Sequence, residues 1–456
     1  MKRIKRVTGV CLAAGMAAGL ISGCGGGTAA KTTTSAAATT KAETASQSSQ
    51  SGNSSDKVTL RMAWWGGDAR HKALLATIDA YTAKHPNVSI EAEYQGYDGY
   101  YEKMMTELSS GTAPDIFQFH ANWVPDVQGA DHYLADLSKF PVVDYSQLPE
   151  TIIEGSDTYK GERVLYSCSE GGQVMYVNTD VASKFGIDLT KNYTWDEWLQ
   201  LGKSIHEQDP DTYLMTADID VLNRLILPIA VSQQTGTSMV DADYKMTFSE
   251  EQLTKALQLI ADLYDTGTCE PYGDASVFVG QMDQNNKWIN GQIGVLLDIV
   301  GGYAKYKASI TSELGAMAIP RFEGAKCSGV DFSGDMGYSI NDKSKNKEVA
   351  ADFLNYMFND PEANSILLTN LGYPASKEAQ STLAAAGKID KVQQDAAAIS
   401  EKDAIKYTSA SNNTDLETIR KNDLQEMIYG EMTPEETAKD IIEQYTDTLN
   451  QMKSAK

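Results

Sequence analysis

Cysteine and histidine are scarce in this chain, and neither is spaced as a metal site requires. The 456 residues include five cysteines and five histidines, and no CxxC pair occurs. Metal sites built from these residues need a characteristic ligand spacing that is missing here. GxSxG, HExxH, P-loop and GxGxxG segments are missing too, so common signatures of hydrolases and nucleotide-binding enzymes do not appear. We therefore predict no metal, no cofactor and no catalytic activity.

Basic residues are also few. Lysine and arginine number 39 against 62 aspartates and glutamates, which gives a formal net charge of −23. A surplus of negative charge repels the phosphate backbone of nucleic acids and anionic lipid headgroups. We therefore expect no nucleic-acid partner and no membrane docking through surface charge.

The N-terminus has no apolar run long enough to span a bilayer. Four of the first six residues are basic, and the apolar run from Val10 to Ile21 is followed by small residues. A membrane-spanning helix needs about 20 apolar residues, so residues 1–23 are predicted to be a secretory signal peptide. The segment Leu20-Ile21-Ser22-Gly23-Cys24 resembles a bacterial lipobox. That resemblance implies that Cys24 is diacylated; an ordinary signal peptide with a chance cysteine is the alternative.

Residues 24–56 lack apolar periodicity and consist largely of Gly, Ala, Ser and Thr. Such a segment cannot bury enough surface to fold, so we expect a flexible tether. The remaining chain, about 400 residues, is too long for one ordinary hydrophobic core and favours two lobes. These features predict a lipid-anchored protein on the extracytoplasmic face of the membrane, and the long tether favours the surface of a Gram-positive cell over a Gram-negative periplasm.

Alternating apolar residues predict strands at 58–65 and 88–94, and a short apolar run predicts a third strand at 116–119. Helical periodicity fills the intervals between them. Strand and helix in strict alternation indicate a parallel α/β sheet with right-handed crossovers. Later in the chain Thr194 and Glu197 are spaced as a helix capping box.

Eight segments stand in the order found in extracellular family 1 solute-binding proteins, the maltose-binding-protein-like carbohydrate receptors of ABC importers. The resemblance covers nearly all of the mature chain. The opening segment, residues 64–71, is in addition similar to binding lipoproteins for pectin-derived oligosaccharides such as rhamnogalacturonan fragments. The eight segments are residues 64–67, 81–86, 110–115, 175–178, 194–198, 290–295, 344–350 and 372–376.

The resemblance implies a type II periplasmic-binding-protein-like fold, in which hinge strands join two α/β lobes around a ligand cleft. Carried over by motif, lobe one would hold residues 57–168 with 299–334. Lobe two would hold residues 170–297 with 336–456. The implied function is capture of an oligosaccharide by hinge closure of a monomer and delivery to the permease subunits of an ABC importer.

Candidate ligand-binding residues stand where the predicted strands end. Trp64 and Trp65 end the first strand, and Gln118 and His120 end the third. Ligands of open α/β sheets bind beyond the carboxyl ends of the strands, and a tryptophan ring can stack on a pyranose face. The alternative is that both tryptophans pack internally.

Arg70 lies in the first turn of a predicted helix, where the helix dipole disfavours a cation. Such a position calls for a compensating anion, which is either an internal carboxylate or a uronate on the ligand. His71 beside it could donate a hydrogen bond or be a plain surface histidine.

Further candidates come from the rest of the chain: Glu170, Trp288, Asp298 and Asp335, and with less support Trp123 and Tyr303. Carboxylates accept hydrogen bonds from sugar hydroxyls. The alternative is that these acids are solvent-exposed surface residues without a role in binding. Cys168, Cys269 and Cys327 allow at most one disulfide.

Three rival functions remain open. A secreted carbohydrate-active enzyme could use Glu170 with Asp298 or Asp335 as a carboxylate pair. A receptor for ferric ion or a polyamine, and a structural cell-wall adhesin, are the others.

Overall fold

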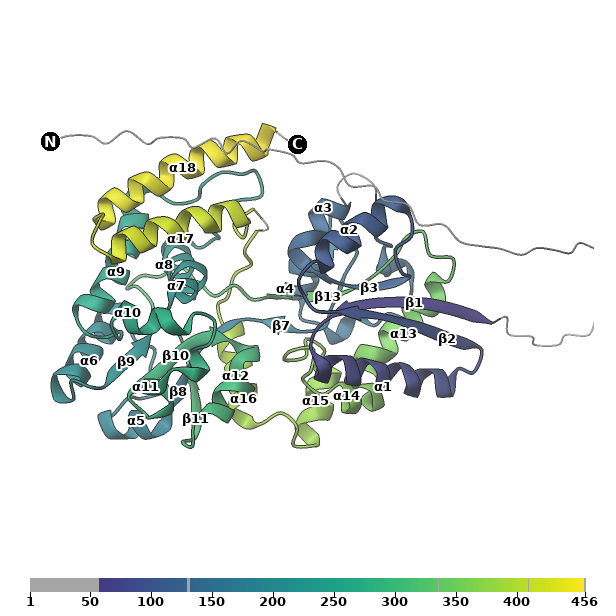
Figure 1. The fold of residues 1–456 in the computed structure, drawn as a ribbon, viewed down its shortest axis with the longest axis horizontal. Coiled ribbons are helices and arrows are strands. Elements are labelled where there is room, and N and C mark those ends of the chain that lie inside the picture. The colour runs from purple at the N-terminus through teal and green to yellow at the C-terminus, as the bar shows by residue number, and fades with distance from the viewer. Residues whose placement is uncertain (1–56, 129–131, 335, 409, 455–456) are drawn as a thin grey trace, which may run out of the picture. The chain divides into compact units, whose positions relative to one another are not determined.

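The computed structural model describes residues 57–128, 132–334, 336–408 and 410–454 (Figure 1). The predicted signal peptide, Cys24, the tether and Asp335 lie outside the described residues, so these expectations stay predictions. Among the described helices none is both long and apolar enough to cross a bilayer.

The first sheet has five strands in the order β2 (Val88–Gln95), β1 (Val58–Trp65), β3 (Ile116–His120), β13 (Met336–Ile340) and β6 (Tyr166–Ser167). Strand β1 runs parallel to β2 and to β3, while β13 is antiparallel to β3 and to β6. The three strands predicted from the sequence are therefore present and parallel. Their carboxyl ends meet at one edge of the sheet.

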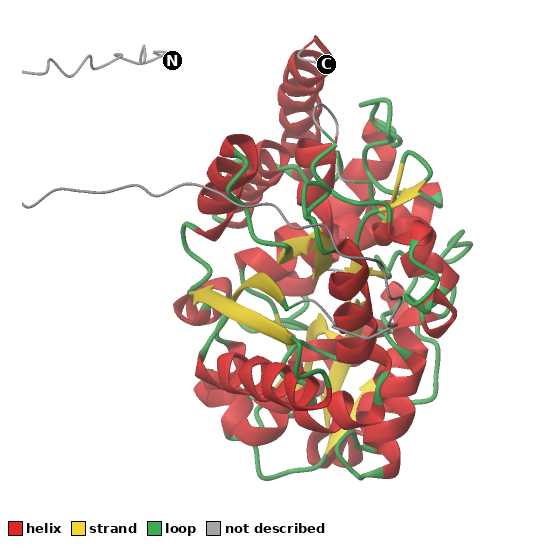
Figure 2. Ribbon diagram, turned by 90° about the vertical axis from the view of Figure 1, so that its right-hand side faces the viewer, coloured by secondary structure: helices red, strands yellow, loops and turns green. Residues whose placement is uncertain are grey.

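Strand β1 is buried on both faces from Met62 to Trp65. Sheets of this kind are covered on both sides by helices; Figure 2 shows the strands enclosed by helices. Five helices belong to the lobe of this sheet: α1 (Asp68–Lys84), α2 (Tyr100–Ser110), α13 (Lys347–Asn359), α14 (Pro361–Leu367) and α15 (Lys377–Ala385).

The second sheet has four strands in the order β11 (Leu314–Met317), β8 (Gln173–Asn178), β10 (Ile293–Ile299) and β9 (Tyr213–Thr216). Its helices include α6, which begins with the predicted capping box between Thr194 and Glu197. The helices that follow or accompany this sheet are α5 (Thr179–Phe185), α6 (Trp195–Gln208), α7 (Ile219–Val221), α8 (Leu227–Thr235), α9 (Glu250–Asp265), α10 (Tyr272–Ala275), α11 (Asn286–Ile289), α12 (Tyr303–Ser309), α16 (Lys391–Glu401), α17 (Thr414–Ile428) and α18 (Pro434–Ser454).

Each sheet has its own hydrophobic core. One cluster gathers around the first sheet, from Leu60 to Ala375, and two clusters gather around the second. The two-lobe α/β architecture expected from the resemblance is therefore present.

The chain passes between the sheets through two short strands that pair antiparallel, β7 (Glu170–Gly171) and β12 (Ser333–Gly334). This pairing corrects the predicted lobe composition. Residues 299–334 are not part of lobe one, because β11 pairs with β8 in the second sheet. Residues 336–385, from β13 to α15, return to the first sheet, because β13 pairs with β3 and α15 packs on α13 and α14.

The physical reason lies after β10. Instead of crossing near residue 299, the chain turns through η8 (Val300–Gly302) into α12. There the buried side chains of Val300, Tyr303 and Tyr306 pack into a core of the second sheet.

Cys269 and Cys327 are buried free thiols. Because any pair drawn from the three cysteines of the described region would include one of these two, no disulfide joins them. The Sγ of Cys168 donates to the carbonyl oxygen of Met336 at 3.3 Å.

Candidate functional site

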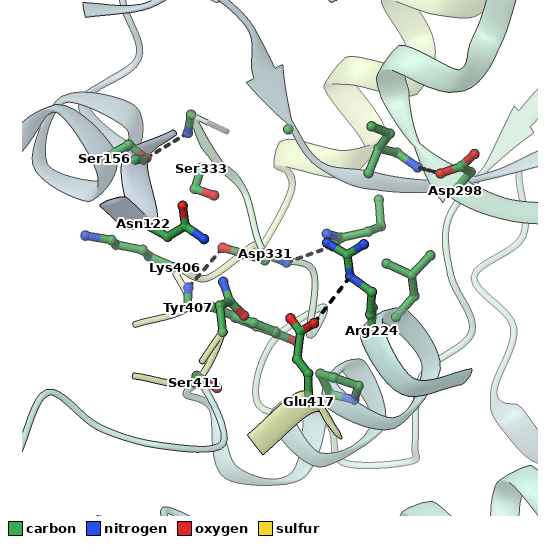
Figure 3. Close-up of a pocket in the computed structure, with 18 of the residues that line it drawn as sticks. Asn122, Ser156, Arg224, Asp298, Asp331, Ser333, Lys406, Tyr407, Ser411 and Glu417 are labelled. Atoms are coloured by element: carbon green, nitrogen blue, oxygen red, sulfur yellow. Dashed lines mark hydrogen bonds and ion pairs between the residues drawn. The ribbon is translucent and has the colours of Figure 1, made fainter. Parts of the chain in front are cut away.

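A cavity of about 530 Å³ is lined by segments that follow strands of both sheets (Figure 3). One side comes from the first sheet, at residues 121–125 and 155–159. The other comes from residues 218–228, 280–282, 298–306 and 406–420, and the crossing strands β7 and β12 contribute Gly171, Ser333 and Gly334. A volume of this size is typical of small-molecule binding sites.

The side from the first sheet is mostly neutral and polar. Strand β3 ends at His120 and continues into the turn η1 (Ala121–Trp123), which places exposed Asn122 on the cavity wall. Ser156 lies in η4 (Ile153–Asp157), and its Oγ accepts a hydrogen bond from the backbone N–H of Gly334 at 2.8 Å. We name the lining residues of these two segments the neutral wall: Ala121, Asn122, Val124, Pro125, Gly155, Ser156, Thr158 and Tyr159.

The opposite side carries charge. Arg224, in η5 (Leu222–Ile226), places its Nε 3.9 Å from Oε2 of Glu417, which is the outer limit of an ion pair (Figure 3). Its side chain is 63% exposed. Lys406 lines the same cavity, and its aliphatic stem lies beside Gly155 of the opposite side; burial lowers its pKa, and Asp331 and Asp157 oppose that change. Within the described residues no carboxylate lies within ion-pair distance of Lys406 Nζ. We name residues 218–228 and 406–420 the charged wall.

The acids that line the cavity already have internal partners. Asp298 accepts from the hydroxyl of Tyr306 and forms an ion pair with Lys305 Nζ at 2.9 Å. Asp220 pairs with Lys421 at 3.0 Å.

The two remaining aspartates are tied to the backbone. Asp218 accepts from the N–H groups of Val221 and Gly280 at 2.8 and 3.0 Å. Asp331 accepts from the N–H of Tyr407 at 2.9 Å, and burial raises the pKa of Asp331 to about 6. Glu417 is paired with Arg224 at the outer limit of an ion pair, so Arg224, Lys406 and Glu417 are the charged groups of this wall that a ligand meets with the least internal competition.

Four predicted site residues come together at the carboxyl edge of the first sheet. The backbone N–H of Trp65 donates to Oε1 of Gln118 at 3.2 Å. The Trp65 ring lies 4.8 Å from the His120 ring and 5.4 Å from the Trp123 ring, measured between centroids. Trp65 is only 6% exposed and Gln118 is fully buried, so both support this edge from beneath.

Trp64, His71 and Arg70 do not line the cavity, which corrects their expected place. Trp64 is fully buried, and its Nε1 donates to Nδ1 of His71 at 3.0 Å. Arg70 donates from Nε to the carbonyl oxygen of Asn370 at 3.0 Å, and from Nη1 to that of Trp65 at 3.2 Å. The compensation that Arg70 calls for is thus supplied by backbone carbonyls instead of a carboxylate.

Of the candidates from the rest of the chain, only Asp298 lines the cavity among those that the structure describes. Trp288 and Tyr303 are buried in a core of the second sheet, where Trp288 Nε1 donates to Ser309 Oγ at 2.8 Å. Glu170 lines a different crevice, beside α15 and α16. Burial, followed by the nearby charge of Glu401, raises the pKa of Glu170 to about 8.

Sequence reasoning missed Asn122, Arg224, Lys406 and Glu417. Asn122 follows a predicted strand end by two residues and could have been found by the rule that gave His120. The other three come from a π-helical turn, an irregular segment and the first turn of α17, where no periodic pattern marks them.

Comparison with known proteins gives consistent results. The family model described as bacterial extracellular solute-binding protein matches residues 68–364. An arabinooligosaccharide-binding protein of Halalkalibacterium halodurans is 23% identical over 296 residues, which cover 63% of this chain and 64% of the relative. The match therefore spans slightly less than two thirds of that relative's length.

Two solved structures share the fold over most of the chain. A periplasmic oligogalacturonide binding protein from Yersinia enterocolitica is 25% identical, with a TM-score of 0.72, covering 86% of this chain and 99% of that one. A periplasmic solute binding protein from Pectobacterium atrosepticum is 23% identical, with a TM-score of 0.76 and the same coverage. Because the family model matches well over half of the chain, the protein belongs to the bacterial extracellular solute-binding protein family.

Proposed function

We propose that this protein captures an oligosaccharide outside the cell and delivers it to an ABC-type importer. The observation that carries the proposal is the cavity, whose walls come from segments that follow both sheets. Neutral side chains on one wall and cations on the other offer the directional polar contacts that sugar hydroxyls need. The arabinooligosaccharide-binding relative and the oligogalacturonide-binding neighbour support the substrate class.

A carbohydrate-active enzyme is the alternative, and the geometry disfavours it. Of the two proposed carboxylate pairs, Glu170 with Asp298 joins residues that line different hollows. The other pair includes Asp335, which lies outside the described residues. Asp298 is in addition tied to Lys305 and Tyr306. Incubating the protein with oligosaccharides and measuring new reducing ends tests this alternative; turnover above background would favour the enzyme.

We infer further that the oligosaccharide carries carboxylates, as uronates do. Arg224 and Lys406 take over the role first expected of Arg70, because both line the cavity, Arg224 with its ion-pair partner Glu417 at 3.9 Å and Lys406 beside Gly155. A guanidinium binds a carboxylate through two parallel hydrogen bonds and is the stronger of the two anchors. In support, the structure of the Yersinia protein is a complex with saturated digalacturonic acid.

The N-terminal features complete the proposal. A signal peptide over residues 1–23 would direct export. A lipid on Cys24 and the tether to residue 56 would then hold a monomeric receptor on the extracytoplasmic face of the cell membrane. Cys24→Ser should then move the protein from the membrane fraction to the medium. Retention in the membrane fraction would contradict the anchor but not the binding function.

Binding itself is tested by titration calorimetry with matched neutral and uronate oligosaccharides. We expect Arg224→Gln to weaken the binding of uronate oligosaccharides about tenfold, which corresponds to a loss of about 1.4 kcal/mol of binding free energy. The affinity for neutral sugars should stay unchanged. Lys203→Gln is the control, because Lys203 is an exposed cation away from the cavity, 61% exposed. If only neutral sugars bind, the uronate inference fails; if no oligosaccharide binds, the proposed function fails.

A further inference from the structure

Aromatic residues collect where the parallel strands of the first sheet end. Trp65 ends β1, Tyr97 follows the end of β2 by two residues, and His120 ends β3. Since the three strands run in the same direction, these residues share one edge of the sheet. Ligands of α/β folds bind at this edge.

These rings contact one another and form a layered surface. Trp123 and Tyr97 stack with centroids 6.2 Å apart and planes 26° apart, and His120 meets Trp123 edge-on at 4.7 Å. Trp65 packs beneath all three, within 5.8 Å of each ring. We name Tyr97, His120 and Trp123 the aromatic platform.

The platform combines a fixed base with an accessible top. Trp65 is 6% exposed, whereas Tyr97 is 54% exposed. Tyr101 braces Trp123 from α2, with centroids 4.9 Å apart. Rings held in this way lose little freedom when a ligand covers them, so stacking on them costs little ordering entropy.

The platform is continuous with the cavity. Ala121 and Asn122 line the cavity, and Trp123 is the next residue of the same turn. A chain of sugars that leaves the cavity past Asn122 therefore meets Trp123 first and Tyr97 next. The platform has no part in the cavity lining itself, so it is a separate surface.

The geometry points to a second binding surface for the same ligand: the aromatic platform stacks the sugar rings that extend beyond the cavity. The inference rests on the proposed function and deepens it. The apolar C–H faces of pyranose rings are complementary to the faces of tyrosine and tryptophan, which bury much area when covered. Long oligosaccharides are thus the substrate class, with short ones held by the cavity alone.

The test is a titration of one oligosaccharide series, from disaccharide to hexasaccharide, against the full chain. We expect wild-type affinity to rise with chain length. Tyr97→Ala should lower affinity for the longest member about tenfold, the effect of losing roughly 50 Å² of apolar contact, and leave the disaccharide unchanged. Tyr97→Phe should keep wild-type affinity throughout, because stacking needs the ring and not the hydroxyl.

The control is Tyr429→Ala, since Tyr429 is 65% exposed and lies at the end of α17, outside the platform. The inference would be overturned if Tyr97→Ala lost the same affinity for short and long oligosaccharides, or lost no affinity for either. A loss in Tyr97→Phe as large as that in Tyr97→Ala would overturn it too. If the wild type binds the disaccharide and hexasaccharide equally, the platform proposal fails and the proposed function stands. If the wild type binds neither, both fail.

Trp123→Phe provides a second readout. In the wild type, the long oligosaccharide should quench tryptophan fluorescence and the disaccharide should not. In Trp123→Phe, the quenching by the long oligosaccharide should be reduced. Unchanged quenching in Trp123→Phe would contradict contact with the platform.

Discussion

The neutral wall and the charged wall of the cavity are built in different ways. The neutral wall follows directly from β3 and from a nearby turn, and it continues into the aromatic platform. The charged wall brings together η5 and the segment that leads into α17, which are almost two hundred residues apart in sequence. Short turns beside a sheet edge hold rings in fixed places, while arginine and lysine reach the cavity on long side chains.

This contrast suggests a division of roles. Rigid apolar surface contributes area and therefore affinity that varies little between sugars. Charged groups on long stems contribute selectivity, because they distinguish a carboxylate from a hydroxyl. The predictions below test whether the two walls act in this way.

The largest expected effect concerns the hydrophobic core of the first sheet, from which the neutral wall extends. Trp64→Ala removes a fully buried ring that stacks on Tyr94, with centroids 5.1 Å apart. The free energy of unfolding should fall by about 3–5 kcal/mol, as measured by denaturant titration. Affinity of the folded fraction should stay within twofold of wild type, because Trp64 does not line the cavity; a large loss of affinity would mean that Trp64 contacts the ligand.

The next effect concerns the cavity itself. Ala121→Trp places a large ring where the neutral wall faces the ligand, and it should weaken binding of every oligosaccharide by at least about a hundredfold. Calorimetry measures the loss, and the melting temperature shows that the fold is kept. Val277→Trp is the matched control, because Val277 is 74% exposed and outside the cavity lining. Wild-type affinity in Ala121→Trp would show that the ligand binds elsewhere.

A smaller effect concerns a buried acid behind the neutral wall. Asp157 accepts from the Oγ of Ser167 at 2.6 Å and from its N–H at 3.1 Å, and burial raises its pKa to about 8. A carboxyl whose pKa is raised on folding binds more protons in the folded state. Stability is therefore lost as pH rises from about 4 to about 8.

Asp157→Asn removes this titration while keeping the shape of the side chain. The fall in melting temperature between pH 5 and pH 8 should be smaller in the variant than in the wild type. Asp243→Asn is the control, since the side chain of Asp243 is 79% exposed. Identical pH profiles for wild type and Asp157→Asn would show that Asp157 stays ionised in the folded protein.

The same contrast explains what the sequence could predict. The alternation within 58–65 and the apolar run 116–119 are local signals, and they predict β1 and β3. The strand-end rule then selects Trp64, Trp65, Gln118 and His120. The charged wall depends on how segments far apart in the sequence pack together. The sequence around Arg224 or Lys406 has no local pattern that predicts this packing. The predicted lobe composition was wrong because its bounds were carried over by motif, and only the tertiary pairing of β11 with β8 and of β13 with β3 shows which sheet each strand joins.

Trp64, Arg70 and His71 illustrate a second limit of prediction from sequence, which concerns the direction of side chains. Their positions at a strand end and in a first helical turn were identified correctly, but side-chain direction was not. The ring of Trp64 turns to His71, and Arg70 turns to the carbonyl oxygens of Trp65 and Asn370. Residues next to a binding edge can thus serve the fold alone.

A crystal structure of the protein grown with a uronate hexasaccharide tests the central claim most directly. We predict electron density for sugar rings between Asn122 and Arg224, with a carboxylate on the guanidinium and further rings over Tyr97. Density confined to the crevice beside Glu170, or a cavity that holds only water at saturating sugar, would contradict the account.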